Sequence, residues 1–124
     1  MYGLGKLGDK VTAFTVRVVR ATEYLKERKA LSLADQFFRS GTSIGANCSE
    51  AVYAVSKADF LNKLHIALKE TNETAHWIEV MYQGQYIDYN SYESILGDCI
   101  EIRKLLSTIT RNVRTTIQND TKKD

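Results

Sequence analysis

The stretch LNKLHIALKETNETAHWIEVMY, Leu61–Tyr82, decides the fold class of this chain. Apolar or small residues recur along it at steps of three and four: Leu61, Leu64, Leu68, Thr71, Ala75, Ile78 and Tyr82. This spacing places them on one face of an α-helix, because about 3.6 residues complete a turn. Gly84 follows as a C-terminal stop. The stretch therefore predicts an amphipathic helix.

Three other stretches repeat the same spacing. Their stripes are, in chain order, Val11, Phe14, Val18, Ala21 and Leu25; Leu33, Phe37, Ser40, Ile44 and Ala51, which is broken at position 47 by an asparagine; and Tyr92, Ile95, Cys99, Ile102, Leu106, Ile109 and Val113. Residues 1–8 hold three glycines and are expected to form a flexible lead. Asp9 then caps the first helix, because its carboxylate can accept the free N–H groups of the first turn. The helices are expected to span residues 9–117, and the polar residues 118–124 to fray.

Four amphipathic helices with short connections predict an all-α fold, an antiparallel up-down-up-down four-helix bundle. The 124 residues are enough for one domain with a real core. Proline is absent, which is consistent with long helices, since proline disrupts a helix interior.

The composition favours a soluble, cytoplasmic protein without cofactor or metal. Hydrophobic residues make up 44% of the chain and charged residues 26%, and no apolar run is long enough to cross a membrane. The N-terminus lacks the pattern of a secretory signal. Cys48 and Cys99 have no CxxC partner, and His65 and His76 lie eleven residues apart, so a zinc site is not expected. The two cysteines are expected to be reduced packing residues.

The segment RSGTSIGANCSE, Arg39–Glu50, is a poor helix by intrinsic propensity. Small residues there allow a neighbouring helix to approach closely, with Gly41 and Gly45 as the contact and the hydroxyls bonded to carbonyls one turn earlier. No Gly-Lys-Ser/Thr follows, so this is not a phosphate loop. We expect a helix-packing motif made of Arg39, Ser40, Gly41, Ser43, Gly45, Asn47 and Glu50.

The run RSGTSIGANCSEA resembles the signature of the four-helix bundle family encoded in bacterial 23S ribosomal-RNA intervening sequences, the ribosomal protein S23-like proteins. Phe60–Met81 resembles the third helix of that family, and DKVTAFTVRVVRATEYLKER its first. The resemblance implies a bundle that assembles into a ring, commonly a pentamer. A more distant relative, the accessory variability protein of diversity-generating retroelements, is basic and works with a reverse transcriptase and nucleic acid. The resemblance carries no settled biochemical activity.

Charge is distributed unevenly along the chain. Residues 1–39 hold eight Lys/Arg against four Asp/Glu, residues 40–100 three against eight, and residues 101–124 six against three. At about 100° per residue, the cations of the last helix fall on one flank, and those of the first helix do the same. The candidate nucleic-acid-binding residues, for RNA or DNA, are Lys10, Arg17, Arg28, Arg103, Lys104, Arg111 and Arg114. The alternative is a solvated surface whose charges pair with the acidic helices.

The third helix also carries apolar residues away from its predicted seam. Ile66, Trp77 and Val80 share a face with Glu73, and a tryptophan on an outward face indicates a protein–protein contact. We therefore expect an oligomer interface at Ile66, Glu73, Trp77 and Val80. Glu73 needs a cationic partner, and Arg39 is the candidate.

Catalysis is not expected. Ser43, Cys48, Asn47, Glu50 and His65 could form a catalytic set on paper, but Ser and Asn in the second helix are explained by packing. Two functions remain open: a non-catalytic homo-oligomer that binds nucleic acid or a nucleic-acid enzyme through the first and fourth helices, or a protein–protein assembly scaffold.

Overall fold

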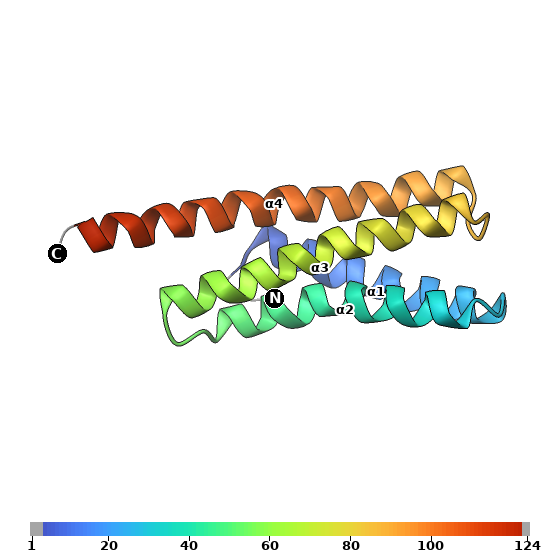
Figure 1. The fold of residues 1–124 in the computed structure, drawn as a ribbon, viewed down its shortest axis with the longest axis horizontal. Helices are drawn as coiled ribbons and strands as arrows, with labels where there is room; N and C mark the ends of the chain where they lie inside the picture. The colour runs from blue at the N-terminus through green and yellow to red at the C-terminus, as the bar shows by residue number, and fades with distance from the viewer. Residues whose placement is uncertain (1–3, 123–124) are drawn as a thin grey trace.

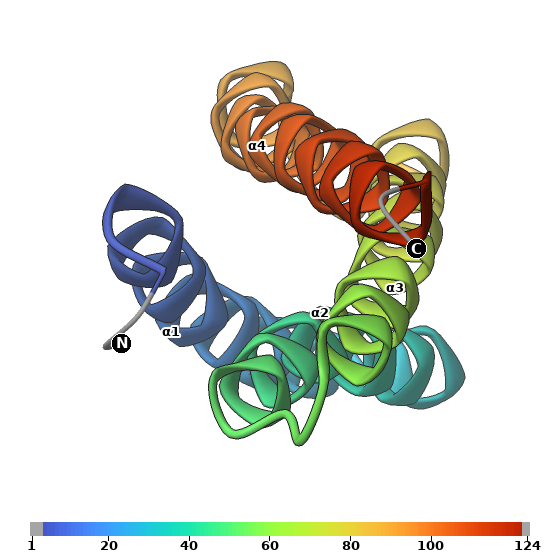
Figure 2. The same ribbon diagram turned by 90° about the vertical axis from the view of Figure 1, so that its left-hand side faces the viewer.

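The computed structural model describes residues 4–122, which form four α-helices and no strand. These are α1 (Lys6–Glu27), α2 (Leu31–Val52), α3 (Lys57–Gln83) and α4 (Tyr89–Lys122). Each helix runs antiparallel to the next and packs against it, and α1 and α4 make the smallest contact (Figures 1 and 2). The predicted four-helix bundle is confirmed. None of the helices in the described residues is long and apolar enough to span a membrane.

Two of the predicted helix ends are wrong. α1 begins at Lys6 rather than after Asp9, because Leu7 and Gly8 are already buried against the core. Asp9 lies in the first turn, where its charge favours the helix dipole, and Gly5 occupies the N-cap position. The lead predicted over residues 1–8 is therefore helical from Lys6 onward, and residues 1–3 lie outside the described range.

α4 also continues past the predicted end at residue 117, as far as Lys122. An ion pair of 2.5 Å between Lys57 and Asp120 ties this end of α4 to the start of α3. The hydroxyls of Thr115, Thr116 and Thr121 donate to carbonyls one turn earlier, so these side chains do not compete with the helix. Residues 118–122 of the predicted frayed tail are thus helical, and residues 123–124 lie outside the described range.

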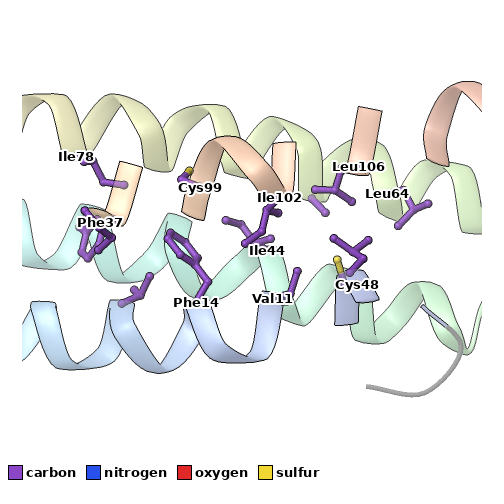
Figure 3. Close-up of a cluster of buried hydrophobic side chains, with 14 of the residues drawn as sticks. Val11, Phe14, Phe37, Ile44, Cys48, Leu64, Ile78, Cys99, Ile102 and Leu106 are labelled. Atoms are coloured by element: carbon purple, nitrogen blue, oxygen red, sulfur yellow. The ribbon is translucent and has the colours of Figure 1, made fainter. Parts of the chain in front are cut away.

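The core is a continuous apolar cluster to which all four helices contribute (Figure 3). Both cysteines belong to it and are free thiols. Burial raises the pKa of the Cys48 thiol to about 11 and that of Cys99 to about 12. Both thiols are therefore neutral near pH 7 and act as small apolar groups.

The seam of α3 differs from the predicted one by a rotation of the helix. The buried residues are Leu64, Ala67, Thr71, Thr74, Ile78 and Met81. Tyr82, predicted on the seam, is half-buried and stacks on Tyr92 of α4 instead. The reason is that α3 packs against both α2 and α4, so its most buried line lies where its two contact faces meet. The small residues Ala67 and Thr74 on that line carry little hydrophobic signal in the sequence.

The poor helix-forming segment of α2 is the place where α1 and α2 approach most closely. A Cβ at Gly41 would lie 2.7 and 2.8 Å from the two methyl groups of Val18, far inside van der Waals contact. A Cβ at Gly45 would lie 3.1 Å from Thr15 Oγ1. On the other side of α2, the hydroxyl oxygens of Ser40 and Thr74 lie 3.0 Å apart in the buried contact with α3. The small residues of α2 therefore set the spacing to both neighbours.

We predict that Gly41→Ala destabilises the protein by about 1–3 kcal/mol, because the added methyl group would overlap Val18. Gly97→Ala is the matched control, since Gly97 lies inside α4 and nothing lies within 4 Å of its added Cβ. This control should stabilise the protein by about 0.5–1 kcal/mol through helix propensity alone. Urea unfolding followed by circular dichroism measures both. Equal effects of the two substitutions would contradict the close approach.

Candidate nucleic-acid interface

The predicted cations of α1 are engaged with α4. Lys10 Nζ lies 2.8 Å from Glu101 Oε1, and Arg17 Nη1 lies 2.5 Å from Asp98 Oδ2. Arg17 also donates to the hydroxyl of Ser94 at 3.1 Å. The hydrogen bond from Lys10 lowers the pKa of the Glu101 carboxyl, so this group stays ionised at neutral pH. These pairs join two helices that otherwise make little contact, and they neutralise the two cations.

Arg28 holds the turn between α3 and α4. Its Nη1 donates to the carbonyl oxygens of Gln85 at 3.2 Å and Tyr86 at 2.8 Å. Its guanidinium carbon lies 5.2 Å from the centre of the Tyr86 ring, within the range of a cation–π contact. Carbonyls and a ring do not cancel a unit charge, so Arg28 remains cationic while its side chain is fixed in place.

The predicted cations of α4, in contrast, form no ion pair with a carboxylate in the described residues. Within residues 4–122, Arg103, Lys104 and Arg111 form no salt bridge or side-chain hydrogen bond, and Lys104 and Arg111 are exposed. Arg114 Nη2 lies 3.1 Å from His65 Nε2 of α3 and meets no carboxylate in the described residues. We call these four residues the α4 basic flank. The seven predicted cations therefore fall into an engaged set on α1 and a set on α4 without carboxylate partners.

The predicted interface residues of α3 do not form an outward face. Ile66, Glu73, Trp77 and Val80 are all half-buried, on the side of α3 that meets α2. Arg39 of α2 pairs with Glu73, as the sequence predicts, and also with Glu70 at 3.2 Å. The predicted outward placement is wrong, because the rotation of α3 turns these residues toward α2. Their role as an oligomer interface stays a prediction. The exposed face is polar: Asn62, Lys69, Asn72, His76, Glu79 and Gln83.

The remaining members of the helix-packing motif make local and interhelical contacts. Ser43 Oγ donates to the Arg39 carbonyl at 2.7 Å, and Asn47 Nδ2 donates to the Ser43 carbonyl at 2.9 Å. Glu50 pairs with Lys63 of α3 at 3.1 Å. The catalytic set considered above is not assembled: the hydroxyl of Ser43 is engaged, and His65 contacts Arg114. The described residues contain no cluster of three or more His, Cys, Asp or Glu side chains that could hold a metal ion.

Comparison with known proteins agrees with the fold. The family described as 23S rRNA-intervening sequence protein matches residues 6–108. This chain belongs to that family. A crystal structure at 1.70 Å of a protein of unknown function from the S23 ribosomal protein family of Bacteroides thetaiotaomicron VPI-5482 is 50% identical in sequence. The match covers 84% of this chain and 97% of the other, with a TM-score of 0.82. No curated protein matches the chain.

The family match ends within the α4 basic flank. Arg103 and Lys104 lie inside residues 6–108, whereas Arg111 and Arg114 lie beyond them. The helix itself continues without interruption to Lys122. The family match therefore covers only half of the flank.

The sequence did not predict an apolar surface that lies on α1 and α2. Val16 and Val19 of α1 are 47% and 38% exposed, and Phe38 of α2 is 44% exposed. The first two border a groove of about 560 Å³ between α1 and α2, at a place where Gly45 and Ala46 provide little bulk. The sequence does contain one indication of this surface, because Val16 and Val19 are apolar residues outside the stripe of the first helix.

We predict that the pair formed by Arg17 and Asp98 contributes at most about 1 kcal/mol, because both side chains are more than a third exposed. A double-mutant cycle with Arg17→Met and Asp98→Asn should show a positive coupling energy in low salt that decreases in 1 M NaCl. Lys69→Met, at an exposed cation in the middle of α3 without an ion pair in the described residues, should leave stability nearly unchanged. A coupling energy of zero in low salt would show that the pair does not join α1 to α4.

Proposed function

We propose that this protein is a non-catalytic helical bundle that binds the phosphate backbone of double-helical nucleic acid through the α4 basic flank. The observation that carries the proposal is the absence of carboxylate partners for Arg103, Lys104, Arg111 and Arg114 within the described residues. Cations already neutralised in the folded protein cannot replace the counterions of a duplex without breaking their own pairs. Free cations can do so, and counterion release drives such binding.

The geometry of the flank fits a rigid, repeating polyanion. Arg103 and Arg114 are eleven residues apart on one continuous helix, which corresponds to a rise of about 16 Å. The four cations lie within about 100° of arc on one side of the helix, at uneven intervals along it, and the packing of α4 against α3 holds them in place. Arg114 also meets His65, so α3 contributes a further polar group beside them. Such contacts position a backbone without reading its sequence.

The double substitution Arg111→Glu and Arg114→Glu tests this site. It should lower affinity for a 20-base-pair duplex at least about tenfold at 50 mM salt, because two phosphate contacts become repulsive. Fluorescence anisotropy with labelled duplex RNA and duplex DNA measures the affinity. Lys26→Glu combined with Lys29→Glu is the matched control, with the same change in net charge on exposed residues at the end of α1 and in the turn that follows it. Equal weakening by both double variants would mean that net charge, and not the flank, determines binding.

A second candidate function is supported by the apolar surface of α1 and α2. Val16, Val19 and Phe38 are large apolar side chains in solvent, and the first two line the groove between α1 and α2. Thr42, which lines the groove, donates to the carbonyl of Phe38, so the two residues lie one turn apart on the same face of α2. Such a surface is typical of a protein–protein contact. We propose that copies of this chain assemble through it, as the ring of the resembling family implies.

Val19→Glu combined with Phe38→Glu should then convert the assembly to monomers, because each copy would bury an unpaired carboxylate. Light scattering coupled to size exclusion at micromolar concentration measures the mass. Val55→Glu is the control, since Val55 is 92% exposed and lies in the turn between α2 and α3, away from the groove. A monomeric wild type would exclude the assembly, and a double variant of unchanged mass would exclude this surface.

A further inference from the structure

A trough runs between α1 and the segment that connects α3 to α4. It consists of two adjoining cavities of about 550 Å³ each, which share Tyr24, Ile87 and Asp88 in their walls. Apolar side chains, among them Ala21, Met81 and Ile95, line one of the two cavities, whereas polar side chains line most of the other. The trough lies at the end of the molecule where α3 turns into α4 (Figure 1). Arg111 and Arg114 are 22 and 25 residues further along α4 than its first residue, Tyr89.

One stripe of α1, together with the residue after the helix, lines the trough with three arginines and one tyrosine. Arg17, Arg20, Tyr24 and Arg28 follow one another at steps of three, four and four, so they share one helical face. Tyr24 is 45% exposed, and its ring is available to a ligand. Arg20 forms no ion pair within the described residues, and Arg28 is bound only to carbonyls and a ring. Two uncompensated charges therefore flank an exposed aromatic ring.

The opposite wall is built around Tyr86. A Cβ at Gly84 would lie 3.0 Å from a carbon of the Tyr86 ring and 3.0 Å from the Val80 carbonyl oxygen, so a glycine is needed for the ring to sit where it does. The next residue, Gln85, has a φ of 64°, in the left-handed region that glycine adopts most easily. The turn thus accepts local backbone strain while placing Tyr86 under Arg28 and Gln85 in the cavity wall.

A cluster of tyrosines continues from this wall onto α4. Tyr82, which lines the trough, stacks on Tyr92 with ring centres 4.3 Å apart, and Tyr89 packs against both. Tyr92 donates a hydrogen bond of 2.9 Å to Glu79. These contacts fix the orientation of the Tyr82 ring, so a ligand that stacks in the trough would meet rings that are already ordered.

The carboxylates of Asp98 and Asp88, near the trough, already bind groups of the protein. Asp98 pairs with Arg17, and Asp88 accepts a hydrogen bond of 2.7 Å from the backbone N–H of Ser91 at the start of α4. This bond lowers the pKa of Asp88, so it remains an anion and a hydrogen-bond acceptor in the cavity wall. An anionic ligand must therefore place its charge near Arg20 and Arg28, and its hydrogen-bond donors near Asp88.

We infer that this trough binds single-stranded nucleic acid, with an unpaired base stacked against Tyr24 and Tyr86 and its phosphates near Arg20 and Arg28. Tyrosine rings combined with free arginines and apolar side chains are the groups that bind unpaired nucleotides without reading their sequence. A duplex cannot use the rings, because its bases are already stacked on one another. The Asp88 carboxylate can accept from an exocyclic amino group of the base. The site deepens the proposed nucleic-acid function but uses none of the residues of the α4 basic flank.

The test compares a labelled single-stranded cytidine octamer with an abasic octamer of the same charge, by fluorescence anisotropy at 50 mM salt. The wild type should bind the normal octamer about fivefold to a hundredfold more tightly than the abasic one, which is the range of one base stacked on an aromatic ring. Tyr24→Leu should remove this preference, and Tyr24→Phe should retain it. Tyr53→Leu is the matched control, since Tyr53 is 83% exposed and lies outside the trough.

Equal affinity of the wild type for the two octamers would overturn the inference, and so would an unchanged preference in Tyr24→Leu. The variant with Arg111→Glu and Arg114→Glu separates the two sites. It should lose duplex binding while it keeps the preference for the normal octamer. A protein that ignores duplexes but shows the preference for bases would contradict the α4 proposal and support the trough.

Discussion

The contact between Gly41 of α2 and Val18 of α1 is the constraint on which the arrangement of the four helices depends. Because Gly41 has no side chain, α1 lies against α2 at a distance that any larger residue would prevent. Ser40 and Thr74 form a small, hydrogen-bonded contact on the neighbouring side of α2, which sets the distance to α3. α2 therefore serves as the reference against which α1 and α3 are placed, and α4 is added through α3. The penalties of Gly, Ser and Thr for helix formation are offset by this packing and by hydroxyls bonded to the preceding turn.

The contact between α1 and α4 closes the bundle by charge rather than by close packing. Lys10 and Arg17 meet Glu101 and Asp98 there, and these pairs involve the N-terminal half of α4 only. The C-terminal half of α4 extends beyond the start of α1 and packs beside α3 (Figure 1). Its cations Arg111 and Arg114 consequently find no acidic partner on α1. The different helix lengths thus explain why this end of α4 keeps its charge, whereas Arg103 and Lys104 lie within one turn of Glu101, whose ion pair is with Lys10.

The sequence predicted the existence, order and type of all four helices, because apolar spacing of three and four reports directly on helical faces. It also predicted the close approach at Gly41 and the pairing of Arg39 with Glu73, both of which follow from the chemistry of single residues. It could not orient α3 correctly, since buried Ala67 and Thr74 carry less hydrophobic signal than the half-buried Leu61 and Leu68. Nor could the sequence separate the cations that form ion pairs from those that do not, because ion pairs between α1 and α4 depend on how the two helices lie against each other. The sequence did not predict the trough either, because Tyr24 and Tyr86 are 62 positions apart in the chain and line the same cavity only in the folded bundle.

The salt dependence of duplex DNA binding by the wild type tests most directly the claim that, of the seven cations predicted from the sequence, the four of the α4 basic flank are the ones that bind a duplex. Each phosphate neutralised contributes a slope of about −0.9 to the plot of log affinity against log salt concentration. Four free cations predict a slope of about −3 to −4 per protomer, whereas all seven cations proposed from the sequence would give about −6. A slope in the first range is the result that the account predicts. A slope near zero, or one near −6, would contradict it, because the ion pairs of α1 would then not determine which charges are available.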